Sequence, residues 1–170
     1  MNAAPVPAAP VPAAANRLRR ALALGGWLLV AFIPALSGAI APPGDWYRAL
    51  AKPEWNPPGW VFGPAWTFLY ASMGVAAWLV WGRGGLRARR RELGWFMVQW
   101  LLNAIWSPLF FGLHQPGWAF AEILLLGASI AITGLYFARA HLVAGLLFLP
   151  YLAWVTFAAL LNFTLWRMNR

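Results

Sequence analysis

The sequence predicts an all-α integral membrane protein, built as a bundle of five transmembrane helices. Of its 170 residues, 62% are hydrophobic and only 10% are charged, whereas soluble domains carry about 25% charged residues. Five apolar segments reach the length of about 20 residues that a helix needs to cross a hydrocarbon core. The chain has no cysteine, which excludes disulfide frameworks, thiolate metal sites and cysteine nucleophiles.

The N-terminal residues 1–16 are expected to form a disordered tail, because a low-complexity Pro/Ala composition cannot bury a core and favours extended conformations. Residues 17–170 form the membrane domain, and its first span covers about residues 21–41. Pro34 should kink this helix without preventing it from spanning the membrane. A cleavable signal peptide is an alternative for this region, but the length and the late arginines argue against it.

Four further apolar segments are separated by glycine, proline or arginine residues. These spans cover about residues 60–81, 93–113, 118–138 and 142–166. The loop before the second span is rich in proline and tryptophan, and Trp55 and Trp60 should sit at headgroup depth as a lid.

The basic residues are divided unequally between the two ends of this bundle. Nine lie at one end (Arg17, Arg19, Arg20, Arg83, Arg87, Arg89, Arg90, Arg91, Arg139) and four at the other (Arg48, Lys52, Arg167, Arg170). The positive-inside rule therefore places the N-terminus in the cytoplasm. An inner membrane is the default location, with an outer membrane as the alternative. The net charge of +9 is explained by orientation, so no nucleic-acid partner is expected.

Three predicted helices each carry a face on which aromatic and polar residues recur at helical spacing. These faces are Trp66, Tyr70, Met73 and Ala77; Gln99, Asn103 and Trp106; and Trp154, Ala158, Leu161 and Asn162. Ordinary helix packing with interhelical hydrogen bonds explains any one of them. Taken together, they favour a mostly apolar pocket with a few polar groups that orient a flat hydrophobic ligand.

Glu122 is the one acidic residue within a predicted span, and intramembrane carboxylates are costly enough to suggest a function. Because it follows Trp118 by one turn, the competing interpretation is that it is solvated or hydrogen-bonded near the surface. His114 and His141 fall in loops at opposite ends, so no metal site is expected. No conventional catalytic set can be assembled from these residues.

Three stretches carry a specific resemblance: KPEWNPPGWVFGPAWTFLYASMGVAAWLVW (52–81), QWLLNAIWSPLFFGLHQPGWAFAEILL (99–125) and PYLAWVTFAALLNFTLWRMN (150–169). They closely resemble the TspO family, the tryptophan-rich sensory proteins whose mitochondrial relatives are the translocator protein or peripheral benzodiazepine receptor. The resemblance implies a five-helix bundle, commonly a homodimer, with a cavity that opens toward the loop between helices one and two. It implies tetrapyrrole ligands, protoporphyrin IX or haem, and other flat hydrophobic molecules, with no required cofactor.

The resemblance also assigns the residues of the ligand pocket. They are Phe62, Gly63, Ala65, Trp66, Asn103, Trp118, Ala121, Leu125, Trp154, Ala158 and Leu161. Trp66 and Trp154 match the pair implicated, in some bacterial members, in light- and oxygen-dependent degradation of protoporphyrin. The propionates of such a ligand would need cations, for which Lys52 and Arg48 are candidates.

Two departures from the family pattern bear on partners. Phe163 stands where the mitochondrial proteins carry the tyrosine of a cholesterol-recognition pattern, which argues against sterol specificity. A glycine pair that supports dimer contacts in some relatives is Gly94 and Val98 here. Three functions therefore stay open: a sensory protein that binds tetrapyrroles, tryptophan-dependent photo-oxidative degradation of porphyrin, and porphyrin or sterol transport.

Overall fold

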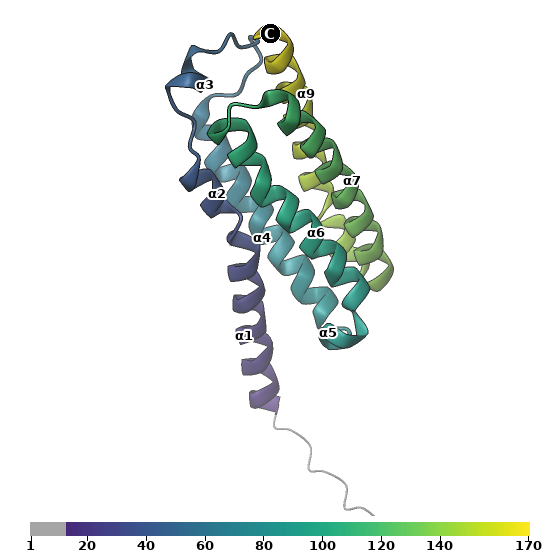
Figure 1. The fold of residues 1–170 in the computed structure, drawn as a ribbon. Helices are drawn as coiled ribbons and strands as arrows, with labels where there is room; N and C mark the ends of the chain where they lie inside the picture. Colours follow the sequence, from purple (N-terminus) through teal and green to yellow (C-terminus); the bar gives the residue numbers. More distant parts are fainter. Residues whose placement is uncertain (1–12) are drawn as a thin grey trace, which may run out of the picture.

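The computed structural model describes residues 13–170, and these form helices joined by loops, with no strand in that range (Figure 1). In chain order the elements are α1 (Ala13–Phe32), α2 (Ala35–Ile40), α3 (Asp45–Ala49), the 3₁₀ turn η1 (Gly59–Val61), α4 (Phe62–Trp81), α5 (Gly85–Ala88), α6 (Arg90–Ser107), the π-helical turn η2 (Pro108–Gly112), α7 (Pro116–Ala140), α8 (Leu142–Leu146) and α9 (Leu149–Met168). Most of the expected tail lies outside the described residues, and its last part, from Ala13 on, is helical.

The long helices lie side by side as an elongated bundle (Figure 1). α1 packs along α4, and α7 packs against both α6 and α9. Large aromatic side chains fill the centre, where Phe96, Phe137 and Tyr151 are fully buried. Gly74 allows the α1 backbone to approach α4 closely, since a Cβ atom there would lie 3.0 Å from the Cα atom of Leu28. Large aromatic side chains therefore fill the centre of the bundle, and a small residue allows α1 and α4 to pack closely.

The first predicted span is broken where Pro34 stands, as expected. α1 ends at Phe32 and α2 begins at Ala35, because proline has no backbone N–H to continue the helical hydrogen-bond ladder. The hydroxyl of Ser37 donates a hydrogen bond to the Pro34 carbonyl over 2.7 Å. α2 is thereby offset from α1 and contacts α6.

Two other predicted spans are also divided. The segment expected as one helix over 93–113 consists of α6 and the turn η2, because the π-helical turn begins at Pro108. The last span consists of α8 and α9, with Pro150 in the first turn of α9, where its missing N–H costs little.

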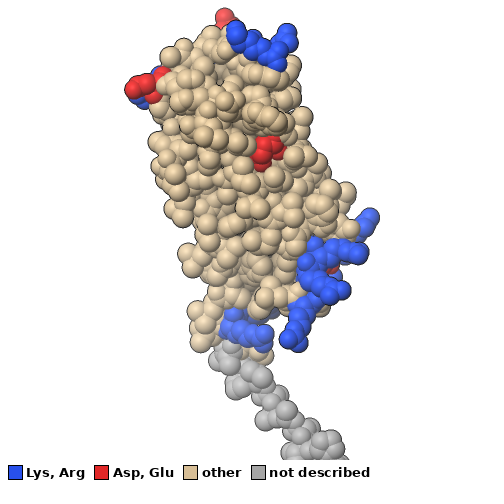
Figure 2. Space-filling model, viewed as in Figure 1, with Lys and Arg blue, Asp and Glu red and all other residues tan. Residues whose placement is uncertain are grey.

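By length and composition, three helical segments of the described chain could cross a membrane: Asn16–Ile40, Pro116–Ala140 and Leu142–Met168. α4 and α6 are nearly as long, with 20 and 18 residues, but they are not among these three segments. Figure 2 shows basic side chains gathered at the two ends of the molecule, and the band between them carries no Lys or Arg on the face that it shows. This distribution is typical of a chain that crosses a bilayer.

Candidate functional site

A cavity of about 470 Å³ lies at the end of the bundle that carries α3 and the C-terminus. Its walls come from α2, α4, α6, η2, α7 and α9, and from the loop between α2 and α4. Most of the lining side chains are apolar, and the amides of Asn56, Asn103 and Asn162 are among the few polar groups. Pockets of about 300–1,000 Å³ with this chemistry are typical of small-molecule sites.

Aromatic rings from α4 and α9 lie next to each other in the wall. The Trp66 ring stacks on Tyr70, with ring centroids 5.2 Å apart and an interplanar angle of 25°. Phe62 meets Trp154 edge to face, with centroids 5.8 Å apart. All four rings line the cavity. The site therefore offers large flat apolar faces to a ligand.

The polar side chains of the wall are held by hydrogen bonds between helices. The Tyr70 hydroxyl donates to Oδ1 of Asn103 over 3.0 Å. The indole N–H of Trp106 donates to Oδ1 of Asn162 over 3.3 Å, and Nδ2 of Asn162 donates to the Pro116 carbonyl over 2.8 Å. These bonds join α4 to α6 and α6 to α9, and so fix the orientation of the groups that a ligand would meet.

The loop between α2 and α4 covers one side of the cavity, and internal hydrogen bonds hold its shape. The Tyr47 hydroxyl donates to Oδ1 of Asn56 over 3.2 Å, and Nδ2 of Asn56 donates to the Pro57 carbonyl over 3.1 Å. Burial raises the pKa of Tyr47 above its usual value, and the hydrogen bond to Asn56 offsets part of that rise. Tyr47 is therefore a neutral hydroxyl at physiological pH.

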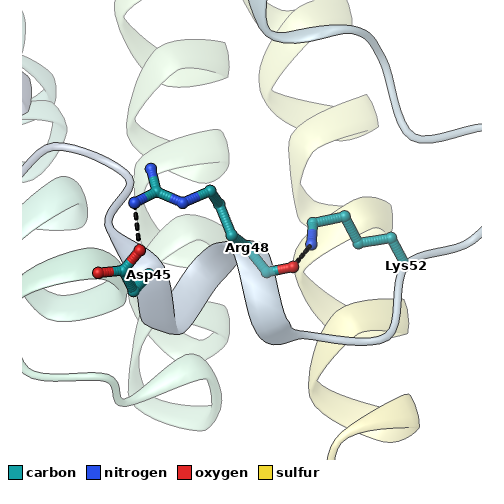
Figure 3. A network of polar contacts seen from close by, with 3 residues as sticks. All are labelled: Asp45, Arg48 and Lys52. Carbon is teal, nitrogen blue, oxygen red and sulfur yellow. Dashed lines mark hydrogen bonds and ion pairs between the residues drawn. The ribbon is translucent and has the colours of Figure 1, made fainter.

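The loop carries four charged residues, none of which lines the cavity: Asp45, Arg48, Lys52 and Glu54. Figure 3 shows the first three. Arg48 pairs with Asp45, which neutralises its charge locally. The ammonium group of Lys52 instead donates to the carbonyls of Arg48 and Leu50, each over 3.0 Å. It also lies 4.8 Å from the centre of the Tyr47 ring. Lys52 therefore places a positive charge, with no carboxylate partner among the described residues, beside a cavity-lining side chain.

The pocket residues assigned by resemblance fall into two groups. Six line the cavity: Phe62, Trp66, Asn103, Trp154, Ala158 and Leu161. Five do not: Gly63, Ala65, Trp118, Ala121 and Leu125. On α7 the inward positions are one or two residues away from the assigned Ala121 and Leu125, since Ile123 and Leu126 line the cavity. Trp118 and Leu125 are 71% and 62% exposed. The ligand-binding role of all eleven stays a prediction.

The loop between α2 and α4 does not cover the cavity with the two tryptophans that were expected to form a lid. Trp55 and Trp60 are 49% and 76% exposed, and neither lines the cavity. Asn56, Pro57 and Gly59, which lie between them, form that wall instead. Phe110 and Phe111 of η2 also line the cavity, and the sequence did not predict this. A π-helical turn changes the direction in which side chains point, and hydropathy does not reveal such a turn.

Glu122 lies in α7 behind the cavity wall and does not line it. The expectation that it is solvated or hydrogen-bonded near the surface is wrong: the residue is 8% exposed, and neither carboxylate oxygen has a hydrogen-bond partner among the described residues. The hydroxyl of Tyr151 is also buried, close to Asn103 and Glu122. Glu122 is therefore a polar group without a hydrogen-bond partner in the described core, and such groups are costly in a low-dielectric interior.

Comparison with known proteins shows which family this chain is similar to. The model of the TspO/MBR family matches residues 22–167. The human translocator protein is 45% identical over 127 residues, which cover 73% of this chain and 75% of that protein. The tryptophan-rich protein TspO of Chlorobaculum tepidum is 42% identical over 157 residues, covering 89% of this chain and 96% of that protein. The tryptophan-rich sensory protein of Cereibacter sphaeroides is 40% identical over 136 residues, covering 80% and 84%.

Proposed function

Because the chain belongs to the TspO/MBR family, we propose that it is a sensory membrane protein whose cavity binds a flat tetrapyrrole, protoporphyrin IX or haem. The observation that carries this proposal is the joint presence of Trp66 and Trp154 on the wall of one apolar cavity. Stacking on aromatic faces contributes about 0.5–1.5 kcal/mol per ring pair beyond burial of area. A macrocycle can use several such faces at once.

The carboxylates of the ligand would be recognised at the loop. Lys52 is half-buried beside Tyr47 and has no acidic partner among the described residues. Arg48 is a weaker candidate because Asp45 already pairs with it. A porphyrin bound with its ring against Trp66 would direct its propionates toward Lys52 at the polar end of the bundle.

The proposed topology has five membrane crossings, with α4 and α6 added to the three strongly apolar segments. α4 packs along α1, and α6 packs along α7, so the five segments lie side by side in one bundle (Figure 1). The nine basic residues near α5, the start of α1 and the end of α7 would face the cytoplasm. The cavity would then open toward the opposite side of the membrane.

Titration of the purified protein with protoporphyrin IX tests the proposal through quenching of tryptophan fluorescence. We expect saturable quenching and a lower affinity in Trp66→Ala and Trp154→Ala. Trp118→Ala is the matched control, because Trp118 is exposed and does not line the cavity. Unchanged affinity in the first two variants, or an equal loss in all three, would contradict the proposed site.

A second candidate function is photo-oxidative degradation of the bound porphyrin, which the position of Trp66 and Trp154 on one cavity also supports. Illumination of the complex in air tests it by following the porphyrin absorbance. Degradation requires bleaching faster than that of free porphyrin, and slower bleaching in the Trp66→Phe, Trp154→Phe double variant. Equal bleaching rates for free porphyrin, the wild-type complex and the double variant would exclude degradation and leave binding as the function.

A further inference from the structure

A second cavity lies at the arginine-rich end of the bundle, near the start of α1 and the end of α4. Its volume is about 160 Å³, which is well above the roughly 15 Å³ that one water molecule occupies by such a measure. It is lined by Arg20, Trp78, Leu79, Gly82, Arg83 and His141. These residues come from α1, from the end of α4 and the turn after it, and from the junction between α7 and α8. None of them lines the larger cavity.

Trp78 holds Arg20 in place at this site. The Trp78 indole N–H donates to the Arg20 carbonyl over 3.0 Å, and the Arg20 guanidinium lies 5.5 Å from the centre of the Trp78 ring. A guanidinium that stacks on an aromatic face keeps its N–H groups at the ring edge, where they can donate to another partner. Trp78 therefore holds the Arg20 guanidinium, a cation, at one side of the cavity.

The charge of the site is not neutralised within the described chain. Residues 13–170 hold two ion pairs, Arg48 with Asp45 and Arg89 with Glu92, and neither involves Arg20 or Arg83. Two like charges around one small cavity repel each other, and an anion between them would remove that repulsion. The cavity is thus electrostatically suited to an anion.

His141 supplies a third polar group. It stands between α7 and α8, where its backbone N–H donates to the Phe137 carbonyl over 2.7 Å. Its side-chain Nδ1 is buried and has no hydrogen-bond partner among the described residues. Buried ring nitrogens are normally paired. With the proton on Nδ1, the imidazole would donate to an acceptor in the cavity that His141 lines.

We propose that this second cavity binds a phosphate group, and that its position favours the headgroup of an anionic lipid as the source. Two guanidinium groups and an imidazole match the charge and the hydrogen-bond acceptors of a phosphate mono- or diester. The site lies beside the start of α1 and the end of α4, at one of the two ends where Figure 2 shows basic side chains gathered. Lipid phosphates would lie at this end. Basic pockets between helices on the cytoplasmic side of a membrane are suited to anionic headgroups.

Native mass spectrometry of the detergent-solubilised protein can test this site. The probes are phosphatidylglycerol, phosphatidylcholine of the same acyl chains, and inorganic phosphate as a competitor. The test variant is Arg20→Gln with Arg83→Gln. The control is Arg87→Gln with Arg91→Gln, which removes the same net charge from exposed positions that do not line the cavity.

We expect the wild-type protein and the control to retain phosphatidylglycerol in preference to phosphatidylcholine. In the test variant the retention should fall by at least about tenfold, since tenfold is the effect of losing one good charge-assisted contact and the variant removes two. Competition by inorganic phosphate at millimolar concentration would assign the site to phosphate in general, and its absence would assign it to the lipid. Both results support the proposal.

Equal retention of phosphatidylglycerol in the test and control variants would overturn the proposal. If the double variant fails to fold, Arg83→Gln alone carries the test, because Arg83 is exposed and follows the end of α4. Its binding of protoporphyrin IX in the larger cavity serves as the folding control. If the variant loses phosphatidylglycerol binding but keeps protoporphyrin IX binding, the smaller cavity is a site distinct from the larger one.

Discussion

Asn169 at the end of α9 holds the backbone of Ala51, 118 residues earlier in the chain, by a pair of hydrogen bonds. The Ala51 N–H donates to Oδ1 of Asn169 over 2.9 Å, and Nδ2 of Asn169 donates to the Ala51 carbonyl over 3.0 Å. Nδ2 also contacts the Leu165 carbonyl over 2.8 Å. Because Ala51 lies in the loop that covers the cavity, this side chain ties the loop to the C-terminal helix.

Asn169→Ala should therefore release the loop and accelerate ligand dissociation. A hydrogen bond of this kind contributes about 0.5–1.5 kcal/mol, so the dissociation rate should rise by between about twofold and tenfold. Stopped-flow fluorescence of the protoporphyrin IX complex measures that rate. Thr164→Ala is a suitable control, because its hydroxyl bonds only to its own helix, at the Leu160 carbonyl. Equal dissociation rates in both variants would show that the loop does not gate the cavity.

The charge of Lys52 should discriminate between porphyrins with free and with esterified carboxylates. Lys52→Gln is expected to weaken protoporphyrin IX binding by about twofold to fivefold at low salt, since exposed ion pairs contribute about 0.2–1 kcal/mol. The dimethyl ester should bind the variant and the wild type equally. Arg48→Gln should have less effect because Asp45 already pairs with that arginine. A loss of affinity for both ligands would point to packing rather than to charge.

Removal of the buried carboxylate at Glu122 should stabilise the protein. Glu122→Leu eliminates two buried oxygens without hydrogen-bond partners, each of which costs on the order of 1–3 kcal/mol. The midpoint of thermal unfolding should rise, whereas Glu122→Gln should change it little because the side chain stays polar. Affinity for protoporphyrin IX should be unchanged, since Glu122 does not line the cavity. A destabilised Glu122→Leu variant would mean that the carboxyl has a partner in the membrane.

Two glycines of α4 should respond oppositely to alanine. At Gly74 the new Cβ would lie 2.9 Å from Cδ2 and 3.0 Å from Cα of Leu28, so Gly74→Ala should force α1 away and destabilise the bundle by about 1–3 kcal/mol. At Gly63 no atom lies within 4 Å. Gly63→Ala should therefore leave the fold intact and add about 0.5–1 kcal/mol of helix propensity. Thermal unfolding in detergent compares the two.

Much of the fold follows from local sequence. Apolar length predicts where the long helices lie, and proline predicts the break at Pro34. The division of the last span into α8 and α9 was not predicted. The orientation of α7 is a different matter. It is apolar on nearly every face, so hydropathy does not distinguish Leu125, which is 62% exposed, from Leu126, which is 2% exposed. Packing against α6 and α9 decides that rotation.

The cavity was predictable to a similar extent. Helical spacing within one segment groups Trp66 with Tyr70, and Trp154 with Ala158, and all four line the cavity. The loop wall depends on long-range contacts, such as the stacking of Trp46 on His114 with ring centroids 4.4 Å apart. The spacing of residues around Trp46, or around His114, does not predict that these two side chains contact each other.

The central claim, that a ligand occupies the cavity between Trp66 and Trp154, is tested most directly by filling that cavity. Ala158→Phe places a ring where Ala158 now lines the space, and Ala153→Phe adds the same ring to an exposed position of α9 outside it. The measurement is the dissociation constant of protoporphyrin IX for each variant. We predict that Ala158→Phe weakens binding by about tenfold or more, the effect of at least 1.4 kcal/mol, while Ala153→Phe binds as the wild type does. Wild-type affinity in a folded Ala158→Phe variant would contradict the account.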